Sequence, residues 1–201
     1  NKNILRKILI IFFILLHLPY QCKNNALNII KQYSMADINK FFPKVIKWEG
    51  GYVNDPADSG GRTKYGVTQK TWIAFGGKKD IKDITEQDAM NVMKSLFWDK
   101  CKGDLIENQS LAEIVVDWFW GSGYSGLKAM QRALNLVPDG KVGPATLHAL
   151  NSDPQIAHFK IKQARIKFID SICESRPLNL KFKKGWLNRI NSYNYEENYT
   201  N

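Results

Sequence analysis

The fold of this chain is decided by residues 48–68, which read WEGGYVNDPADSGGRTKYGVT. Glu49 stands at the end of an apolar stretch with helical spacing, and the two glycines that follow it predict the end of that helix. The rest of the segment is rich in Gly, Asp, Asn, Ser and Tyr, a composition typical of turns joined by short strands. We therefore expect a helix that ends in a carboxyl group beside a small β-hairpin.

The segments around this one predict further helices. Apolar residues recur every three or four positions between Ile38 and Ile46, behind the candidate N-cap Asp37. Pro43 should lie in the first turn of this helix or kink it. Beyond the hairpin, similar signals predict helices over residues 69–75, 86–97, 111–120, 127–136, 144–151, 154–173 and 186–190, with a break at 121–126. The expected fold is mainly α with one small β element.

Composition narrows the class of protein. The chain has 201 residues, of which 44% are apolar and 12% aromatic, enough to form a core without metal or disulfides. This excludes a mostly disordered or collagen-like chain. No apolar run reaches the roughly 20 residues of a membrane span, which excludes a polytopic membrane protein.

The cysteines and histidines do not suggest a metal site. Cys22, Cys101 and Cys173 are far apart, form no CxxC pair and do not cluster with a histidine. We expect no metal and no cofactor. A disulfide between Cys101 and Cys173 would need an oxidising compartment, and two buried free thiols are favoured.

Positive charge is concentrated at the two ends of the chain. The net charge is +10; residues 1–34 hold five basic and no acidic groups, and residues 121–193 hold twelve basic and four acidic ones. This favours a polyanionic partner, which could be nucleic acid, an anionic membrane or a bacterial cell wall. The same charges could equally form an ordinary solvated face.

The N-terminal residues 1–34 have two interpretations. Lys2, Arg6 and Lys7 precede an apolar run over residues 8–18, as in a secretory signal, although the flank up to Cys22 is a poor cleavage site. Alternatively, translation starts at Met35 and residues 1–34 are mis-assigned upstream sequence. The first interpretation predicts a protein of the cell envelope or a secreted one. The second predicts a cytoplasmic protein that is released by lysis.

The residues around Glu49 suggest glycosidase chemistry. Apolar neighbours would favour the neutral carboxylic acid, which is the form that protonates a leaving oxygen. Glycines would let a bulky polymer approach, and Tyr52 and Tyr65 offer aromatic faces for sugar rings. Asp55 and Asp58 could return to face Glu49. These residue types also fit a plain helix end followed by turns, so chemistry alone leaves both open.

The same segment resembles glycoside hydrolase family 108, the N-acetylmuramidases (lysozymes) of bacteria and phages. The resemblance rests on residues 41–43, 49–52, 54–58, 60–61 and 63–68. Residues 131–134, 139–147 and 184–189 resemble the family's companion, a predicted peptidoglycan-binding domain. The resemblance implies a lysozyme-like catalytic domain over 38–123, an orthogonal helical bundle with a small β-hairpin. It also implies a helical peptidoglycan-binding domain over 124–192 and a polar tail over 193–201.

The resemblance also implies roles for single residues. Glu49 would be the general acid that cleaves the β-1,4 bond between N-acetylmuramic acid and N-acetylglucosamine. By similarity to phage-type lysozymes, Asp58 would orient or deprotonate the attacking water and Thr63 would help to hold it. Substrate would contact Tyr52, Asp55, Tyr65 and Gly66. A lytic transglycosylase and a non-catalytic peptidoglycan-binding protein remain alternatives.

Peptidoglycan is the partner that the resemblance implies. Carboxylates on its stem peptides would attract eight basic residues of the C-terminal third: Lys160, Lys162, Arg165, Lys167, Lys181, Lys183, Lys184 and Arg189. No nucleic acid is expected, a membrane contact is expected only through residues 1–34, and the protein should be a monomer. Where many relatives carry Asn, this chain has Gly121, and the preceding Trp118, Phe119 and Trp120 fit core better than a sugar platform.

Overall fold

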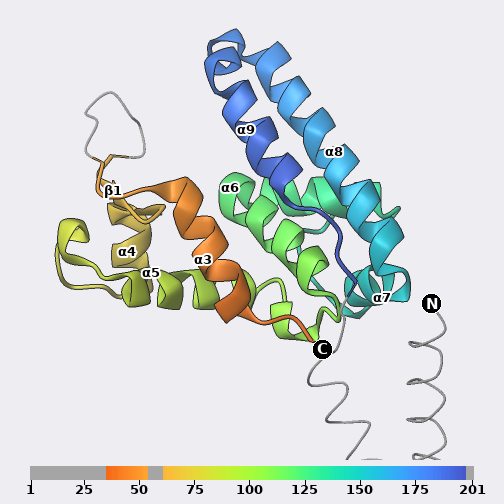
Figure 1. Ribbon diagram of the computed structural model, residues 1–201, viewed down its shortest axis with the longest axis horizontal. Helices are drawn as coiled ribbons and strands as arrows, with labels where there is room; N and C mark the ends of the chain where they lie inside the picture. Colours follow the sequence, from red (N-terminus) through yellow and green to blue (C-terminus); the bar gives the residue numbers. More distant parts are fainter. Residues whose placement is uncertain (1–34, 54–60, 198–201) are drawn as a thin grey trace, which may run out of the picture.

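The computed structural model describes residues 35–53 and 61–197 and is mainly helical, as the sequence predicts (Figure 1). The described part contains seven α-helices and one two-stranded antiparallel sheet. The α-helices are α3 (Ile38–Glu49), α4 (Gln69–Phe75), α5 (Glu86–Met93), α6 (Gln109–Ala133), α7 (Pro144–Ser152), α8 (Pro154–Ser175) and α9 (Leu180–Ser192). The predictions for residues 1–34, for Asp55 and Asp58, and for residues 198–201 lie outside the described residues.

Helix α3 begins and ends where the sequence predicts. The Asp37 side chain caps it by accepting a hydrogen bond from the Asn39 backbone N–H, and Gly50 ends it with a positive φ of 69°. Pro43 lies further along than the expected first turn, inside the helix. The nearby residues Phe42 and Val45 are buried, and their packing offsets the backbone hydrogen bond that proline cannot make.

The hairpin after α3 is small and tightly turned. Strand β1 (Thr63–Lys64) pairs with β2 (Val67–Thr68), with Thr63 opposite Thr68. Tyr65 and Gly66 form the turn and both have positive φ, as in the two-residue turns that join twisted strands. Thr68 then caps α4 by accepting from the Thr71 backbone N–H. The hairpin therefore leads directly into the next helix.

Two local predictions for the central part need correction. The helix opened by the Thr85–Asp88 capping box ends as an α-helix at Met93 and continues as a π-helical turn over Lys94–Trp98. The break expected over residues 121–126 is confined to Gly123, the one residue with non-helical angles inside α6. Glycine is the residue that adopts such angles without steric cost, so α6 runs on after a kink.

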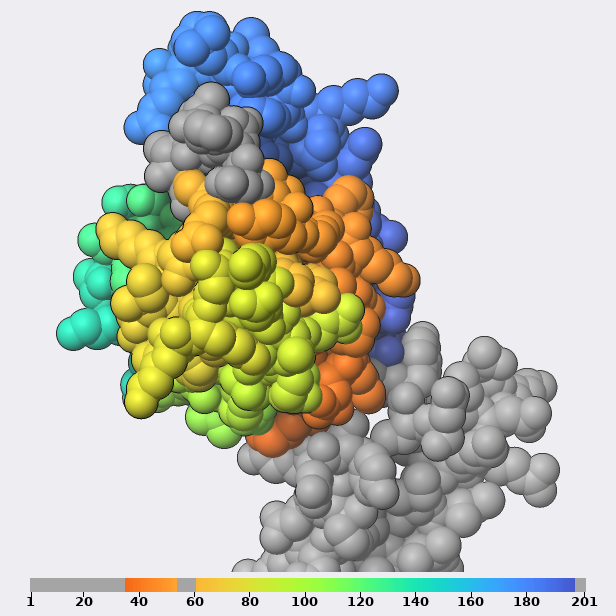
Figure 2. Space-filling model, turned by 90° about the vertical axis from the view of Figure 1, so that its left-hand side faces the viewer, coloured from red at the N-terminus to blue at the C-terminus, as the bar shows by residue number. Residues whose placement is uncertain are grey.

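The C-terminal helices pack on α6. Helices α8 and α9 lie side by side, and α6 makes its most extensive helix contacts with α8 (Figure 1). In Figure 2 the end of this helix pair projects as a lobe beyond the body of the molecule. Helix α9 begins earlier than the expected residues 186–190. Its first turns are largely exposed and carry no apolar periodicity, so the sequence pattern did not indicate them.

A large hydrophobic core extends through both parts of the described structure, and a second, smaller cluster is formed by Ile169, Cys173 and Ile190 of α8 and α9. The large core joins Phe41 of α3 and Trp98 to Leu127 of α6, Ile161 of α8 and Tyr193 after α9. The residues before and after Gly123 thus share buried contacts. No helix within residues 35–53 and 61–197 is long and apolar enough to cross a membrane.

Cys101 and Cys173 are both free and buried, as favoured from the sequence. Burial raises the pKa of the Cys101 thiol to about 12, because the thiolate would lose its hydration. Cys101 is therefore an unreactive core residue.

The capping box of α5 allows a first test. The Thr85 hydroxyl accepts from the Asp88 backbone N–H, and the Asp88 carboxylate accepts from the Thr85 backbone N–H. Because Thr85 is exposed, Thr85→Ala should remove only the cap and lower the free energy of unfolding by about 1 kcal/mol. Denaturant unfolding measures the change. Thr85→Ser keeps the hydroxyl and should stay near wild type; equal losses in both variants would contradict the role of the cap.

Candidate active site

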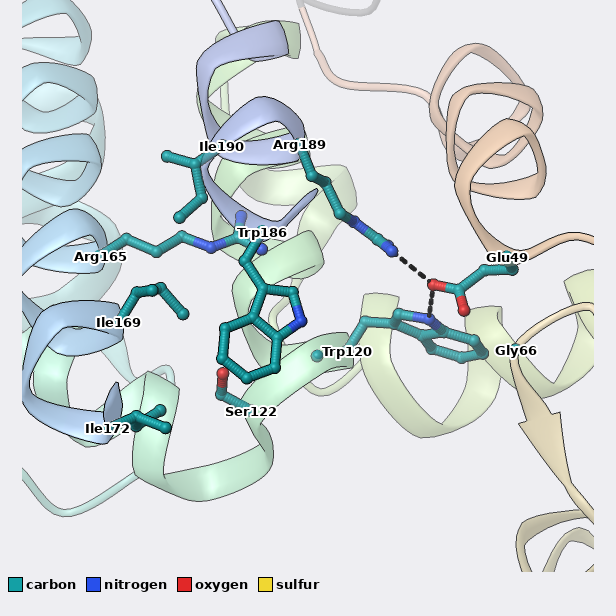
Figure 3. Close-up of a pocket in the computed structure, with 11 residues that line it drawn as sticks. Glu49, Gly66, Trp120, Ser122, Arg165, Ile169, Ile172, Trp186, Arg189 and Ile190 are labelled. Carbon is teal, nitrogen blue, oxygen red and sulfur yellow. Dashed lines mark hydrogen bonds and ion pairs between the residues drawn. The ribbon is translucent and has the colours of Figure 1, made fainter. Parts of the chain in front are cut away.

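Glu49 lies at the mouth of a pocket between the two parts of the chain. It is the last residue of α3, and its side chain is 19% exposed. One carboxylate oxygen, Oε1, accepts a hydrogen bond from Trp120 Nε1 at 2.9 Å and from Arg189 Nη1 at 2.7 Å (Figure 3). The pocket has a volume of about 300 Å³ and is lined by Glu49, Gly66, Trp120, Gly121, Ser122, Arg165, Ile169, Ile172, Trp186, Arg189 and Ile190.

Behind this pocket lies a fully buried carboxylate, Asp117 of α6. Arg165 of α8 donates to it through Nη2 at 2.6 Å, and Arg189 of α9 donates through Nη2 at 2.7 Å. Burial opposes the charge of Asp117, but the two guanidinium groups outweigh this and hold its pKa below the usual range. Burial likewise opposes the charge of Arg189, and Asp117 together with Glu49 keeps its pKa raised. Arg189 is therefore a permanent cation shared by two carboxylates.

Gly66 approaches Glu49 more closely than any larger residue could. A Cβ atom at this position would lie 2.7 Å from both Cδ and Oε2 of Glu49. Gly66 also has a positive φ of 75°, which disfavours other residues. The hairpin turn therefore forms one wall against the carboxyl group, and only glycine leaves that group in its observed place.

Comparison with known proteins finds family models that match two consecutive segments of the chain. The family model Glycosyl hydrolase 108 matches residues 42–123, and the model Predicted Peptidoglycan domain matches residues 125–191. The chain carries a glycosyl hydrolase 108 domain. Glu49, Gly66 and Trp120 of the pocket fall in this domain, whereas Arg165, Trp186 and Arg189 fall in the predicted peptidoglycan domain.

A solved structure supports the same fold. The structure of Brucella abortus SagA matches with a TM-score of 0.68 and 27% sequence identity. The match covers 78% of this chain and 90% of that one. No curated protein matches the sequence.

Three of the other predicted site residues are described by the structure and lie outside the lining of this pocket. Thr63 and Tyr65 belong to the hairpin but do not line the pocket, and the Thr63 hydroxyl donates to the Gly61 carbonyl at 3.2 Å. Tyr52 is 43% exposed and also lies outside the pocket lining. Asp55 and Asp58 lie outside the described residues, so their predicted roles stay predictions. Of the seven residues predicted for the site, the structure brings Glu49 and Gly66 together.

Sequence reasoning missed two partners of Glu49. It expected apolar neighbours, and it assigned Trp120 to the core and Arg189 to the wall-binding cations. Trp118 and Phe119 are indeed buried, but Trp120 turns its indole N–H to Glu49. Arg189 lies 140 residues from Glu49 in the sequence, and no local pattern indicates their pairing.

The basic residues of α8 also need correction. Arg165 is buried and paired with Asp117, and is not part of an exposed cationic face of α8. Lys162 is half-buried and donates to the Tyr193 carbonyl at 3.0 Å. Lys160 and Lys167 are exposed, as expected. In the part of the chain that the structure describes, no group of three or more His, Cys, Asp or Glu side chains could hold a metal ion.

Substitution of Gly66 tests the close approach at the hairpin. The Cβ of Gly66→Ala should displace the Glu49 carboxyl group, and a misplacement of about 1 Å can cost about 10²-fold in rate. Hydrolysis of purified peptidoglycan measures this loss. Gly76→Ala is the matched control, because Gly76 also has a positive φ but nothing lies within 4 Å of its added Cβ. Equal activity of the two variants would rule out the contact as a functional constraint.

Substitution of Asp117 tests the buried ion-pair network. Asp117→Ala leaves two buried guanidinium groups without their shared partner and should lower the free energy of unfolding by about 3–5 kcal/mol. Because the folded-state pKa of Asp117 is lowered, its contribution is complete above about pH 4 and declines as the pH falls further. Asp170→Ala removes a more exposed ion pair with Lys183 and should change stability little. Denaturant unfolding at several pH values compares them, and similar losses in both would contradict the prediction.

Proposed function

We propose that this protein is an N-acetylmuramidase that hydrolyses the β-1,4 bond between N-acetylmuramic acid and N-acetylglucosamine, with Glu49 as the general acid. The glycosyl hydrolase 108 domain supports glycoside hydrolase activity, and the second domain supports peptidoglycan as the polymer. One observation carries the assignment of the acid: the Glu49 carboxyl group faces a pocket whose walls come from both domains.

The surroundings of Glu49 suit proton donation to a glycosidic oxygen. The carboxyl group must carry a proton before cleavage and becomes a carboxylate after it. Arg189 stands at 2.7 Å from Oε1 and can stabilise that carboxylate as it forms. The Trp120 indole N–H, also directed at Oε1, orients the group. Because Arg189 contacts Oε1 directly, this contact must loosen when Glu49 donates its proton to the substrate.

The attacking water needs a second group, and we assign it to Asp58 with help from Thr63. Among the described residues that line the pocket, Glu49 is the single carboxylate. Asp117 is fully buried and bound by two arginines, so it cannot serve as the base. Asp58 follows Glu49 by nine positions in the sequence.

The single carboxylate in the described lining also favours one alternative, a lytic transglycosylase. Such an enzyme closes the sugar on itself and needs no water, hence no second carboxylate. The products differ in mass by one water molecule. Mass spectrometry of digested peptidoglycan therefore separates hydrolysis from transglycosylation, and identification of the new sugar end separates a muramidase from a glucosaminidase.

Glu49→Gln tests the role of the acid. The amide keeps the size of the side chain but cannot donate the proton, so activity should fall at least about 10²- to 10⁴-fold while the fold is retained. Release of reducing ends from purified peptidoglycan and circular dichroism measure the two effects. Glu86→Gln, at an exposed residue in the first turn of α5, is the matched control and should keep full activity. Wild-type activity in Glu49→Gln would refute the assignment, and wall binding by an inactive wild type would favour a binding protein.

A further inference from the structure

The pocket beside Glu49 contains an arginine, Arg165, whose guanidinium group has an N–H donor without a hydrogen-bond partner among the described residues. Arg165 is 6% exposed and lines the pocket, and its Nη2 donates to Asp117. Its other terminal nitrogen, Nη1, is buried and makes no hydrogen bond to any described residue. A guanidinium nitrogen that is buried without a partner costs free energy, and such groups are usually completed by a ligand or water. Figure 3 shows the Arg165 side chain extending from α8 toward Trp186, inside the pocket.

The charges of the pocket are balanced only while Glu49 is ionised. Two guanidinium groups, Arg165 and Arg189, face two carboxylates, Asp117 and Glu49. General acid catalysis requires Glu49 to be neutral. In that state the two arginines retain only Asp117, and one buried positive charge has no counterion. An anionic group on the substrate would restore the balance at the moment when the acid is ready to act.

The rest of the lining selects the kind of anion. Ile169, Ile172 and Ile190 form an apolar wall next to Arg165, and the Trp186 ring lies between this wall and Glu49 (Figure 3). Such a wall suits a short alkyl group attached to the anion. The free Nη1 of Arg165 and the Nη1 of Arg189, once it leaves Glu49, suit the two oxygens of a carboxylate. The lactyl group of N-acetylmuramic acid, where no stem peptide is attached to it, and a stem peptide that ends in alanine each carry a carboxylate next to a methyl-bearing carbon, whereas N-acetylglucosamine carries no carboxylate.

We propose that the pocket is a carboxylate-binding subsite, in which Arg165 and Arg189 bind a carboxylate of the muramyl unit while Glu49 is protonated. This inference rests on the proposed function, because it names the part of peptidoglycan that the same site recognises. The carboxylate takes the place of the Glu49 charge at Arg189, so the substrate itself releases the acid from its ion pair. Arg165 contacts the substrate carboxylate, and Arg189 exchanges one carboxylate for another.

Binding to Glu49→Gln tests the subsite without requiring any activity. Three soluble glycans of equal length are compared: one with free lactyl carboxylates, one with these converted to primary amides, and one with stem peptides attached. Fluorescence of Trp120 and Trp186, which line the pocket, reports binding. The carboxylate ligand should bind about 10- to 100-fold more tightly than the amide ligand, as expected for a charge-assisted hydrogen bond.

The same ligands should distinguish Glu49→Gln from wild type. Removal of the Glu49 charge leaves Arg189 free for the ligand, so the carboxylate glycan should bind more tightly to Glu49→Gln than to wild type, by about tenfold. The amide glycan should show no such preference. Tighter binding of the lactyl form assigns that carboxylate to the subsite, and tighter binding of the peptide-bearing form assigns a stem-peptide carboxylate. Equal affinity for all three glycans would overturn the proposal.

A variant of Arg165 in the Glu49→Gln background assigns the donor. Arg165→Lys keeps a cation for Asp117 but loses the second nitrogen of the fork, so the preference for carboxylate over amide should fall about tenfold. Arg176→Lys, at the exposed end of α8, is the matched control and should keep the preference. An unchanged preference in Arg165→Lys would contradict the role of Arg165. Should that variant fail to fold, the comparison of the three glycans still decides the proposal.

The two proposals can fail independently. If Glu49→Gln retains hydrolysis but binds the carboxylate glycan selectively, the acid assignment is wrong and the subsite stands. If Glu49→Gln is inactive but binds all three glycans equally, the acid assignment stands and the subsite is wrong.

Discussion

The arrangement of this protein depends on one buried carboxylate. Asp117 is fully inaccessible, and its charge is tolerable only because Arg165 and Arg189 approach it from two different helices. These ion pairs connect α8 and α9 to α6. With Arg189 drawn to Asp117, its remaining terminal nitrogen reaches Glu49 at the end of α3. The position of the acid is thereby coupled to the packing of the C-terminal helices.

This coupling makes the second domain part of the pocket that contains Glu49. A peptidoglycan-binding domain attached to a hydrolase would ordinarily act as an anchor that raises the local concentration of substrate. Here the second domain contributes Arg165, Trp186 and Arg189 to the pocket that contains Glu49. The shared hydrophobic core makes the two domains one packed body. The pocket therefore requires both domains, and the hydrolase domain by itself would supply only one of its walls.

Local signals predicted most of the fold. The caps Asp37, Thr68 and Thr85 and the terminator Gly50 act through backbone groups within a few residues, so the sequence around them suffices. The helix predictions failed where tertiary packing competes with the conformational preference of single residues. Pro43 stays within α3 near buried aromatic and aliphatic residues, and α6 passes through three glycines with a kink at only one of them. The exposed residues at the start of α9 show no apolar periodicity that would predict a helix.

The sequence by itself determined that the chain is mainly helical, that Glu49 ends a helix beside a glycine-rich hairpin, and which family this segment resembles. These depend on spacing and on neighbours along the chain. Only the tertiary structure decided that Arg189 and Trp120 hold the Glu49 carboxyl group and that Arg165 is buried while Lys160 and Lys167 remain exposed. A cation on a helix has the same local pattern whether it faces solvent or a buried carboxylate. The choice is made by how distant helices dock, because desolvation and ion pairing act across space and leave no trace in the spacing of residues.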